Sequence, residues 1–135
     1  ATASVPRGLY ARAVGPPLRG DYVLLWLPRD ARALAAERQY LPASVPALKP
    51  VAAMAGDEVC TRAGGVSING APPLARASTD HQERPMPAWE GCRALRANEI
   101  FVLSTYAADS FDGRYFGPSA LADVIEKVTP LWTFP

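Results

Sequence analysis

The sequence predicts a mainly β fold with one or two short helices, and three observations support this prediction. Fourteen prolines and ten glycines divide the 135 residues into short pieces, few of which are long enough for a helix. Several pieces are rich in Val, Ile, Leu and aromatic residues, which favour strands. Glycine-containing pairs between them are typical of turns that join antiparallel strands. The length and the globular composition fit one domain spanning residues 1–135.

Two elements are expected early in the chain. Residues 21–27 (DYVLLWL) are an apolar run closed by Pro28, which predicts a strand buried on both faces. Residues 29–40 are the best candidate helix because they are rich in alanine and place apolar residues at helical spacing. We expect Asp30 to cap this helix, and Pro42 follows its end.

A β-hairpin is expected in the middle of the chain. Residues 49–55 form a small, apolar run that leads into a Gly-Asp pair. Residues 58–60 and 66–68 then flank a glycine pair, which predicts two antiparallel strands joined by a tight turn. The Asn-Gly pair at 69–70 is a second turn signal.

The remaining chain contains a surface excursion and at least one more strand. Residues 71–91 are polar and contain several prolines, so we expect them to run over the surface. Residues 99–104 (EIFVLS) predict a strand. Residues 122–132 fit either a closing strand or a short helix, and the sequence pattern leaves both open.

The overall charge argues against a nucleic-acid-binding protein. Fourteen basic residues face thirteen acidic ones, for a net charge of +1, whereas such proteins carry a basic excess. No run reaches the roughly eighteen apolar residues of a membrane helix. The chain opens without an initiator Met and enters a sequence motif at once, so we expect that an N-terminal membrane anchor has been removed from a larger protein.

The residue inventory restricts the possible catalytic chemistry. The only histidine, His81, lies in the polar excursion, which favours an exposed residue over a catalytic base. Two cysteines and one histidine cannot supply a structural zinc site, so no metal and no cofactor are predicted. A hydrolase built from this chain therefore needs another base. Lys49, in an apolar setting, is the candidate, because desolvation lowers the pKa of a lysine amine toward neutrality.

A candidate nucleophile lies near the start of the chain. Ser4 is followed by Pro6 and Gly8, which restrict and bend the backbone directly after the hydroxyl. Taken alone, this pattern also fits an ordinary turn.

Four segments, taken in order, resemble the sequence boxes of the signal peptidase I-like serine peptidases. They are residues 4–10 (SVPRGLY), 20–23 (GDYV), 48–59 (LKPVAAMAGDEV) and 109–118 (DSFDGRYFGP). The first and last segments look most like the TraF-type branch of conjugal transfer. The resemblance implies a fold of coiled antiparallel sheets of the signal-peptidase type.

The resemblance also implies a Ser–Lys dyad. The Oγ atom of Ser4 would attack the scissile carbonyl, and Lys49 would take its proton and deliver it to the leaving amine. The Ser4 backbone N–H and the Thr2 hydroxyl would stabilise the oxyanion.

Three residues of the last box would support the dyad. Ser110 would hydrogen-bond and orient the lysine, and Asp112 would hold the box in place with Arg114 as its ion-pair partner. Pro50 stands where the family usually has a basic residue, which leaves Arg114 as the remaining partner. Gly113 stands where a small serine is common.

The function implied by the resemblance is maturation of a conjugative pilin precursor, with possible closure of the product into a ring. The partner would be an extended peptide segment of a pilin or of an exported preprotein. The location would be the bacterial inner membrane, with the catalytic domain in the periplasm and close to the membrane surface. Two alternatives stay open: a general signal peptidase that removes leader peptides, and an assembly domain with a vestigial site.

Simpler interpretations exist for several of these residues. Asp112 and Arg114 fit an ordinary surface pair, and Lys49 fits a lysine whose amine reaches solvent from a strand end. Cys60 and Cys92 fit either a disulfide or two buried thiols. The disulfide would bracket the hairpin and the excursion, and export to an oxidising compartment would favour it.

Overall fold

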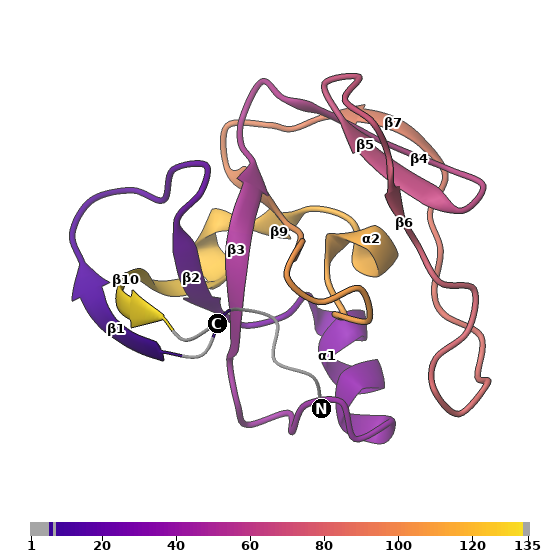
Figure 1. The fold of residues 1–135 in the computed structure, drawn as a ribbon, viewed down its shortest axis with the longest axis horizontal. Helices are drawn as coiled ribbons and strands as arrows, with labels where there is room; N and C mark the ends of the chain where they lie inside the picture. The colour runs from indigo at the N-terminus through magenta and orange to yellow at the C-terminus, as the bar shows by residue number, and fades with distance from the viewer. Residues whose placement is uncertain (1–5, 7, 134–135) are drawn as a thin grey trace.

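The computed structural model describes residue 6 and residues 8–133, and within these the chain forms two antiparallel sheets and two short α-helices. The larger sheet, in spatial order, contains β1 (Gly8–Ala13), β10 (Val124–Thr133), β2 (Tyr22–Leu25), β3 (Ala47–Ala53), β8 (Glu99–Val102) and β9 (Ser119–Ala120). The smaller sheet contains β6 (Leu74–Ala75), β5 (Gly65–Ile68), β4 (Glu58–Arg62) and β7 (Gly91–Ala94). Figure 1 shows the smaller sheet beyond the end of β3. The predicted mainly β fold is confirmed.

Strand β2 is shorter than predicted, and the expectation that both its faces are buried is wrong. The strand spans Tyr22–Leu25, and its residues alternate between half-buried and buried. Val23 and Leu25 are fully buried and pack with residues of α1 (Arg29–Glu37). Tyr22 and Leu24, on the opposite face, are only half-buried, as one face of an antiparallel sheet can remain partly solvated.

Helix α1 begins where predicted but ends at Glu37, three residues earlier than expected. Gln39 has a φ of 61°, a left-handed conformation that ends the helix. The predicted cap is wrong: Pro28 occupies the N-cap position without a side-chain bond, and Asp30 lies inside the first turn. There its negative charge still interacts favourably with the positive end of the helix dipole.

The C-terminal segment, for which the sequence left a strand and a short helix open, contains both. A 3-10 helix (η1, Leu121–Asp123) is followed by β10, a ten-residue strand. Strand β10 pairs with β1 on one side and with β2 on the other. Strand β1 (Gly8–Ala13) was not predicted from the sequence.

The Gly-Asp pair after β3 redirects the chain toward the smaller sheet. Gly56 has a φ of 89°, which a residue with a side chain rarely adopts. Asp57 accepts hydrogen bonds from the backbone of Met54 and from Arg19 and Asn69. The bonds from Asn69 and from Met54 lower the pKa of Asp57. The carboxylate therefore fixes the turn between the two sheets.

The predicted hairpin is confirmed as β4 and β5. Asn69 and Gly70 form the second predicted turn, with φ values of 52° and 76°. The excursion that follows is more ordered than expected. It contributes β6 to the smaller sheet and forms an isolated β-bridge between Thr79 and Pro85.

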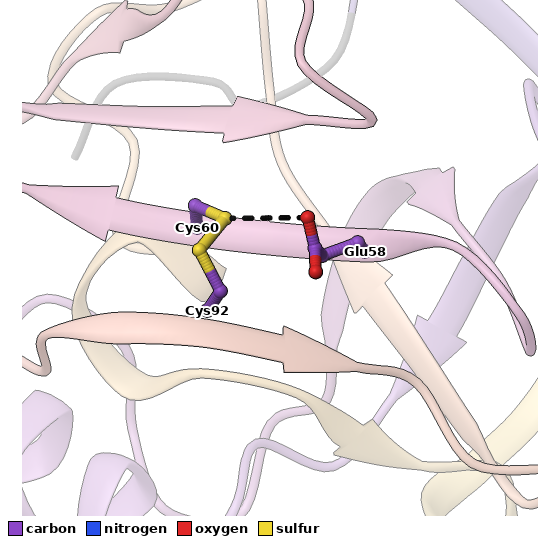
Figure 2. A group of neighbouring side chains, drawn as sticks. All are labelled: Glu58, Cys60 and Cys92. Atoms are coloured by element: carbon purple, nitrogen blue, oxygen red, sulfur yellow. Dashed lines mark hydrogen bonds between the residues drawn. A yellow bond between two sulfur atoms is a disulfide. The ribbon is translucent and has the colours of Figure 1, made fainter.

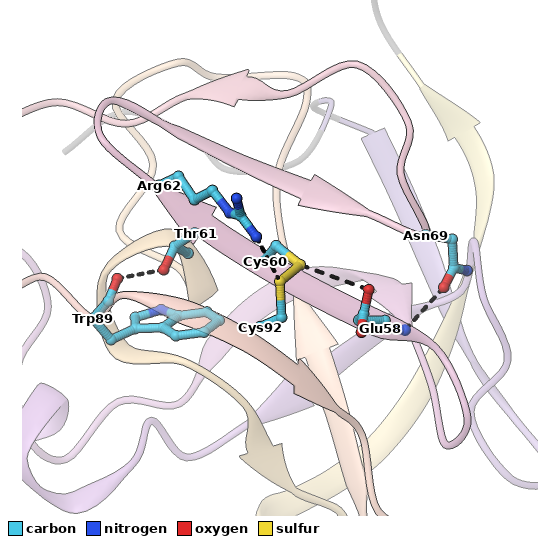
Figure 3. The surroundings of a disulfide bond; sticks show 7 residues. All are labelled: Glu58, Cys60, Thr61, Arg62, Asn69, Trp89 and Cys92. Carbon is cyan, nitrogen blue, oxygen red and sulfur yellow. Dashed lines mark hydrogen bonds between the residues drawn. A yellow bond between two sulfur atoms is a disulfide. The ribbon is translucent and has the colours of Figure 1, made fainter.

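Cys60 and Cys92 form a disulfide at the root of the excursion. They lie directly opposite one another on β4 and β7, with their Cα atoms 4.0 Å apart. The S–S bond is 2.05 Å long. Figure 3 shows that Arg62 approaches this bond, with its guanidinium 3.6 Å from the sulfur of Cys92. The bridge ties the two ends of residues 61–91 together.

Candidate active site

Lys49 lies on the buried face of β3, together with Ala47, Val51 and Ala53. Only 6% of the residue is exposed, which contradicts the alternative of a lysine that reaches solvent. Desolvation by burial lowers the pKa of the Lys49 amine to about 8, against the opposing attraction of Asp112. The positive charge of the nearby Arg114 lowers it further. Near neutral pH this amine therefore has an accessible neutral form, as a general base requires.

The Lys49 amine is hydrogen-bonded to Ser110. The Nζ atom donates to Ser110 Oγ at 2.9 Å, and Ser110 is itself buried. The serine lies on the loop between β8 and α2 (Gly113–Phe116). Its own backbone N–H donates to the carbonyl oxygen of Ala107, which fixes its position in the loop. The lysine and the serine come from segments 61 residues apart in the sequence.

Asp112 holds this loop through a buried ion pair with Arg114. The carboxylate is fully buried and accepts from the Nε and Nη2 atoms of Arg114, both at 2.9 Å. It also accepts from the backbone N–H groups of Ser104 and Arg114. The two residues are thus not an ordinary surface pair. Removing one partner of such a pair costs roughly 3 to 5 kcal/mol.

The other donors of Arg114 bind backbone carbonyl groups of the surrounding loops. Its Nη2 atom donates to Ser104 and Ala107, and its Nη1 atom donates to Ala75 and Ala108. One guanidinium thus joins the loop that carries Ser110 to the start of the excursion. A lysine could not make these bonds, because it lacks the planar fork of donors.

Gly113 is required by packing. A Cβ atom at this position would lie 2.6 Å from the ring of Phe101 and 2.7 Å from the carbonyl oxygen of Val102. The indole N–H of Trp89 donates to the Gly113 carbonyl at 3.0 Å. The ring of Phe101 therefore fills the space that a serine side chain at this position would need.

A large pocket opens beside Lys49 and Ser110, with a volume of about 870 Å³. Its walls come from residues 38–41 after α1, the first half of β3, the loop before α2 and the excursion. The excursion residues at the pocket include Ala77, Thr79, Asp80, His81, Gln82, Arg84 and Met86. The sequence predicted only a surface excursion here, and its contribution to the pocket was not expected.

His81 is exposed, as predicted, but it also lies at the pocket. Its ring hydrogen-bonds Asp109 at 2.8 Å, and 84% of its side chain is exposed. The bond connects the excursion to the loop that carries Ser110.

The predicted positions of Ser4 and Thr2 lie outside the described residues. The first described residue of that segment is Pro6, whose carbonyl oxygen accepts a hydrogen bond from the Tyr10 hydroxyl. Tyr10 in turn packs edge to face against Tyr22 of β2. The segment that follows the candidate nucleophile is thereby tied to the sheet that carries Lys49.

Among the described residues, one group of three potential metal ligands is close together: Glu58, Cys60 and Cys92. Figure 2 shows the Glu58 carboxylate beside the disulfide, with an oxygen 3.8 Å from the sulfur of Cys60. Both sulfurs are committed to the S–S bond, so neither is a thiolate that could bind a metal. Within the described chain, no helix is long and apolar enough to cross a membrane.

Comparisons with known proteins agree on one family. The profile of the family described as "Signal peptidase, peptidase S26" matches residues 4–132. A plasmid transfer protein TraF of Escherichia coli is 34% identical over 98% of this chain and 81% of its own length. A probable conjugal transfer protein TraF of Sinorhizobium fredii is 33% identical over 98% of this chain and 75% of its own.

The fold has a counterpart among solved structures. The crystal structure of a signal peptidase I from Enterococcus faecalis aligns with a TM-score of 0.50 at 18% sequence identity. The alignment covers 87% of this chain and 100% of the other. At this identity the likeness concerns the fold.

Proposed function

Because this chain belongs to the signal peptidase family of S26 peptidases, we propose that it is a serine endopeptidase with Ser4 as nucleophile and Lys49 as general base. One observation carries the proposal: the Lys49 amine is buried, hydrogen-bonded to Ser110 and depressed in pKa at the edge of a large pocket. Structural lysines seldom combine these features, because burying an amine without a chemical role is costly.

The proposed reaction proceeds through an acyl-enzyme. Neutral Lys49 takes the proton of the Ser4 hydroxyl while the oxygen attacks the scissile carbonyl, and the oxyanion is held by the Ser4 N–H and the Thr2 hydroxyl. Lys49 then gives the proton to the leaving amine, and the peptide bond breaks. Water, activated by the same lysine, hydrolyses the ester. Ser110 positions the amine, and Asp112 positions the loop of Ser110.

An extended peptide substrate can be placed along the first half of β3. Strand β2 pairs with β3 from Ala47 to Pro50, whereas β8 pairs only with Val51 and Ala53. Among the described strands, none covers the second edge of residues 47–49, and these residues line the pocket. A substrate strand can add to such an edge through its backbone groups, which would deliver a peptide bond to Lys49.

The relatives named TraF favour a substrate from conjugal transfer, and we propose a conjugative pilin precursor. In the same site an amine of the substrate could resolve the ester in place of water, which closes the product into a ring. We place the catalytic domain, residues 1–135, on the periplasmic side of the bacterial inner membrane, near the membrane surface. General processing of exported preproteins is the alternative function.

Two variants test the dyad directly. Ser4→Ala and Lys49→Ala should each abolish cleavage of a pilin precursor while circular dichroism shows an unchanged fold. Lys49→Arg should be inactive too, because a guanidinium stays protonated, whereas the matched control Lys127→Arg should retain activity. Turnover in either folded dyad variant would falsify the proposal.

A second experiment separates the candidate functions. The wild-type protein is incubated with a pilin precursor or with a generic exported preprotein, and products are weighed by mass spectrometry. Cleavage of the first substrate alone supports the proposed role, and comparable cleavage of both supports the general peptidase. A ring product is lighter than the hydrolysed product by one water.

A further inference from the structure

Residues 77–86 form one wall of the pocket and are hydrogen-bonded to the chain that follows α1. Asp80 anchors this wall: the carboxylate accepts from the Tyr40 hydroxyl at 2.5 Å and from Arg84 Nε at 2.8 Å. It also accepts from the backbone N–H groups of Gln82 and Arg84. Burial opposes its ionisation, yet these hydrogen bonds hold the pKa of Asp80 well below its usual range. Asp80 therefore carries a negative charge at neutral pH.

Two guanidinium groups share this single carboxylate. The Nη1 atom of Arg38 lies 3.6 Å from Asp80, and Arg38 also donates to the Tyr40 hydroxyl and to the Pro85 carbonyl. Arg84 uses only its Nε atom on Asp80. Two positive charges and one negative charge leave the cluster of Arg38, Asp80 and Arg84 with an excess of +1.

The excess charge is presented on Arg84. Its guanidinium lies over the ring of Tyr40, 5.9 Å from the ring centre, and 35% of its side chain is exposed. Its two terminal nitrogens donate to no acceptor among the described residues, and Arg84 lines the pocket. A guanidinium so placed has a fixed orientation and an unused pair of donors, which is the geometry that binds a carboxylate bidentately.

Apart from Asp80, the acidic residue that lines the pocket is Asp109. Asp109 is bound to His81 at 2.8 Å. The two terminal nitrogens of Arg84 can therefore donate hydrogen bonds to a ligand in the pocket.

We propose that Arg84 is a specificity-determining residue that binds a carboxylate of the peptide substrate, from an acidic side chain or from a free C-terminus. This inference rests on the proposed peptidase function, since the pocket is taken as the substrate site. Arg84 would contact a part of the substrate away from the scissile bond. Such a contact contributes equally to the bound substrate and to the transition state, so its loss should raise KM and leave kcat nearly unchanged.

The probe is a set of acetylated, alanine-rich peptides that carry one Glu at successive positions. Each peptide has a partner with Gln at that position, and each is made with a free or an amidated C-terminus. For wild type we expect one Glu register, or the free C-terminus, to lower KM roughly tenfold relative to its neutral partner. The Glu series and the terminal series tell the two carboxylate sources apart.

Arg84→Gln should abolish this preference, so that each Glu peptide has the same KM as its Gln partner. Arg84→Lys should retain part of it, since a lysine keeps the charge but loses the fork. The matched control is Arg96→Gln, because Arg96 is exposed and does not line the pocket; this variant should keep the full preference. Thermal melting of each variant shows whether the wall remains folded.

Equal KM values for acidic and neutral peptides in wild type would overturn the inference, as would a preference that survives in Arg84→Gln. If no peptide is cleaved, fluorescently labelled versions of the same peptides are used, and their binding is measured by fluorescence anisotropy. Carboxylate-selective binding that depends on Arg84 would support the inference while the proposed function fails. Binding without such selectivity, or no binding, would overturn it.

Discussion

Replacing Lys49 with methionine should stabilise the protein near neutral pH, and the gain should disappear as the pH rises. Burial lowers the pKa of the amine from 10.5 to about 8, which corresponds to about 3 kcal/mol of unfavourable free energy when the amine is charged in both states. Methionine removes this penalty with a side chain of similar length. It also removes the hydrogen bond to Ser110, worth about 1 kcal/mol. We expect a net gain of about 2 kcal/mol at pH 7.

The sign of the pH dependence follows from the direction of the shift. Below about pH 8 the amine is protonated in both the folded and the unfolded protein, so the wild type bears the full penalty. Between about 8 and 10.5 the folded protein loses this proton first, the unfolded state binds more protons, and the free energy of unfolding of the wild type rises. The advantage of Lys49→Met should therefore shrink to near zero at pH 10.

Urea denaturation of both proteins at pH 7, 8, 9 and 10 measures this difference directly. Other titrating groups are common to the two proteins and cancel in the comparison. Lys127→Met is the control for removing a lysine elsewhere in the chain. A difference between wild type and Lys49→Met that stays constant from pH 7 to pH 10 would refute the argument that burial prepares this lysine as a base.

Three further outcomes follow from the structure. Ser110→Ala should lower kcat by roughly 10²-fold with little change in KM, because a misplaced base costs rate rather than binding; a normal kcat in steady-state assays would show that the contact is dispensable. Gly113→Ala should lower stability by about 1 to 3 kcal/mol in thermal melts, since its methyl group would meet the Phe101 ring; an unchanged melting temperature would contradict this. Alkylation of unreduced, denatured protein should label neither Cys60 nor Cys92, and two labelled thiols would exclude the bridge. Reduction should cost roughly 3 to 4 kcal/mol in the chain-entropy model and raise KM, because the excursion lines the pocket.

The parts of the fold that were predicted correctly have short-range causes. The β4–β5 hairpin follows from the glycine pair between two β-rich runs, and the turn at Asn69 and Gly70 follows from residues that tolerate positive φ. The start of α1 follows from its alanine content and the preceding proline. Its end was predicted too late, because the left-handed conformation of Gln39 depends on packing rather than on local preference.

The parts that were missed depend on contacts between distant segments. Strand β1 has little β character of its own and exists because β10, at the other end of the chain, pairs with it. The excursion reads as a polar loop, and only its anchoring by Tyr40 to Asp80, 40 residues away in the sequence, makes it a pocket wall. Local periodicity carries no information on such pairings.

The residues of the candidate site were likewise predicted only in part from the sequence. Lys49 stood out by its apolar neighbours, and its place on the buried face of β3 follows from the alternation of the strand. The partnership of Asp112 and Arg114 followed from their proximity in the chain, but their complete burial did not. Arg84 could not be selected by sequence pattern. Which of its nitrogens lack an acceptor depends on the hydrogen bonds that the surrounding residues make in the folded protein.

The most direct test of the Ser–Lys mechanism is to locate the acyl group. The wild-type protein is mixed with the p-nitrophenyl ester of an acetylated alanine peptide, quenched in acid and mapped by mass spectrometry. We predict a single acyl adduct on Ser4, formed faster as the pH rises through about 8, the pKa of Lys49, and absent from Lys49→Met. An adduct elsewhere, or acylation of Ser4 at the same rate without Lys49, would contradict the account.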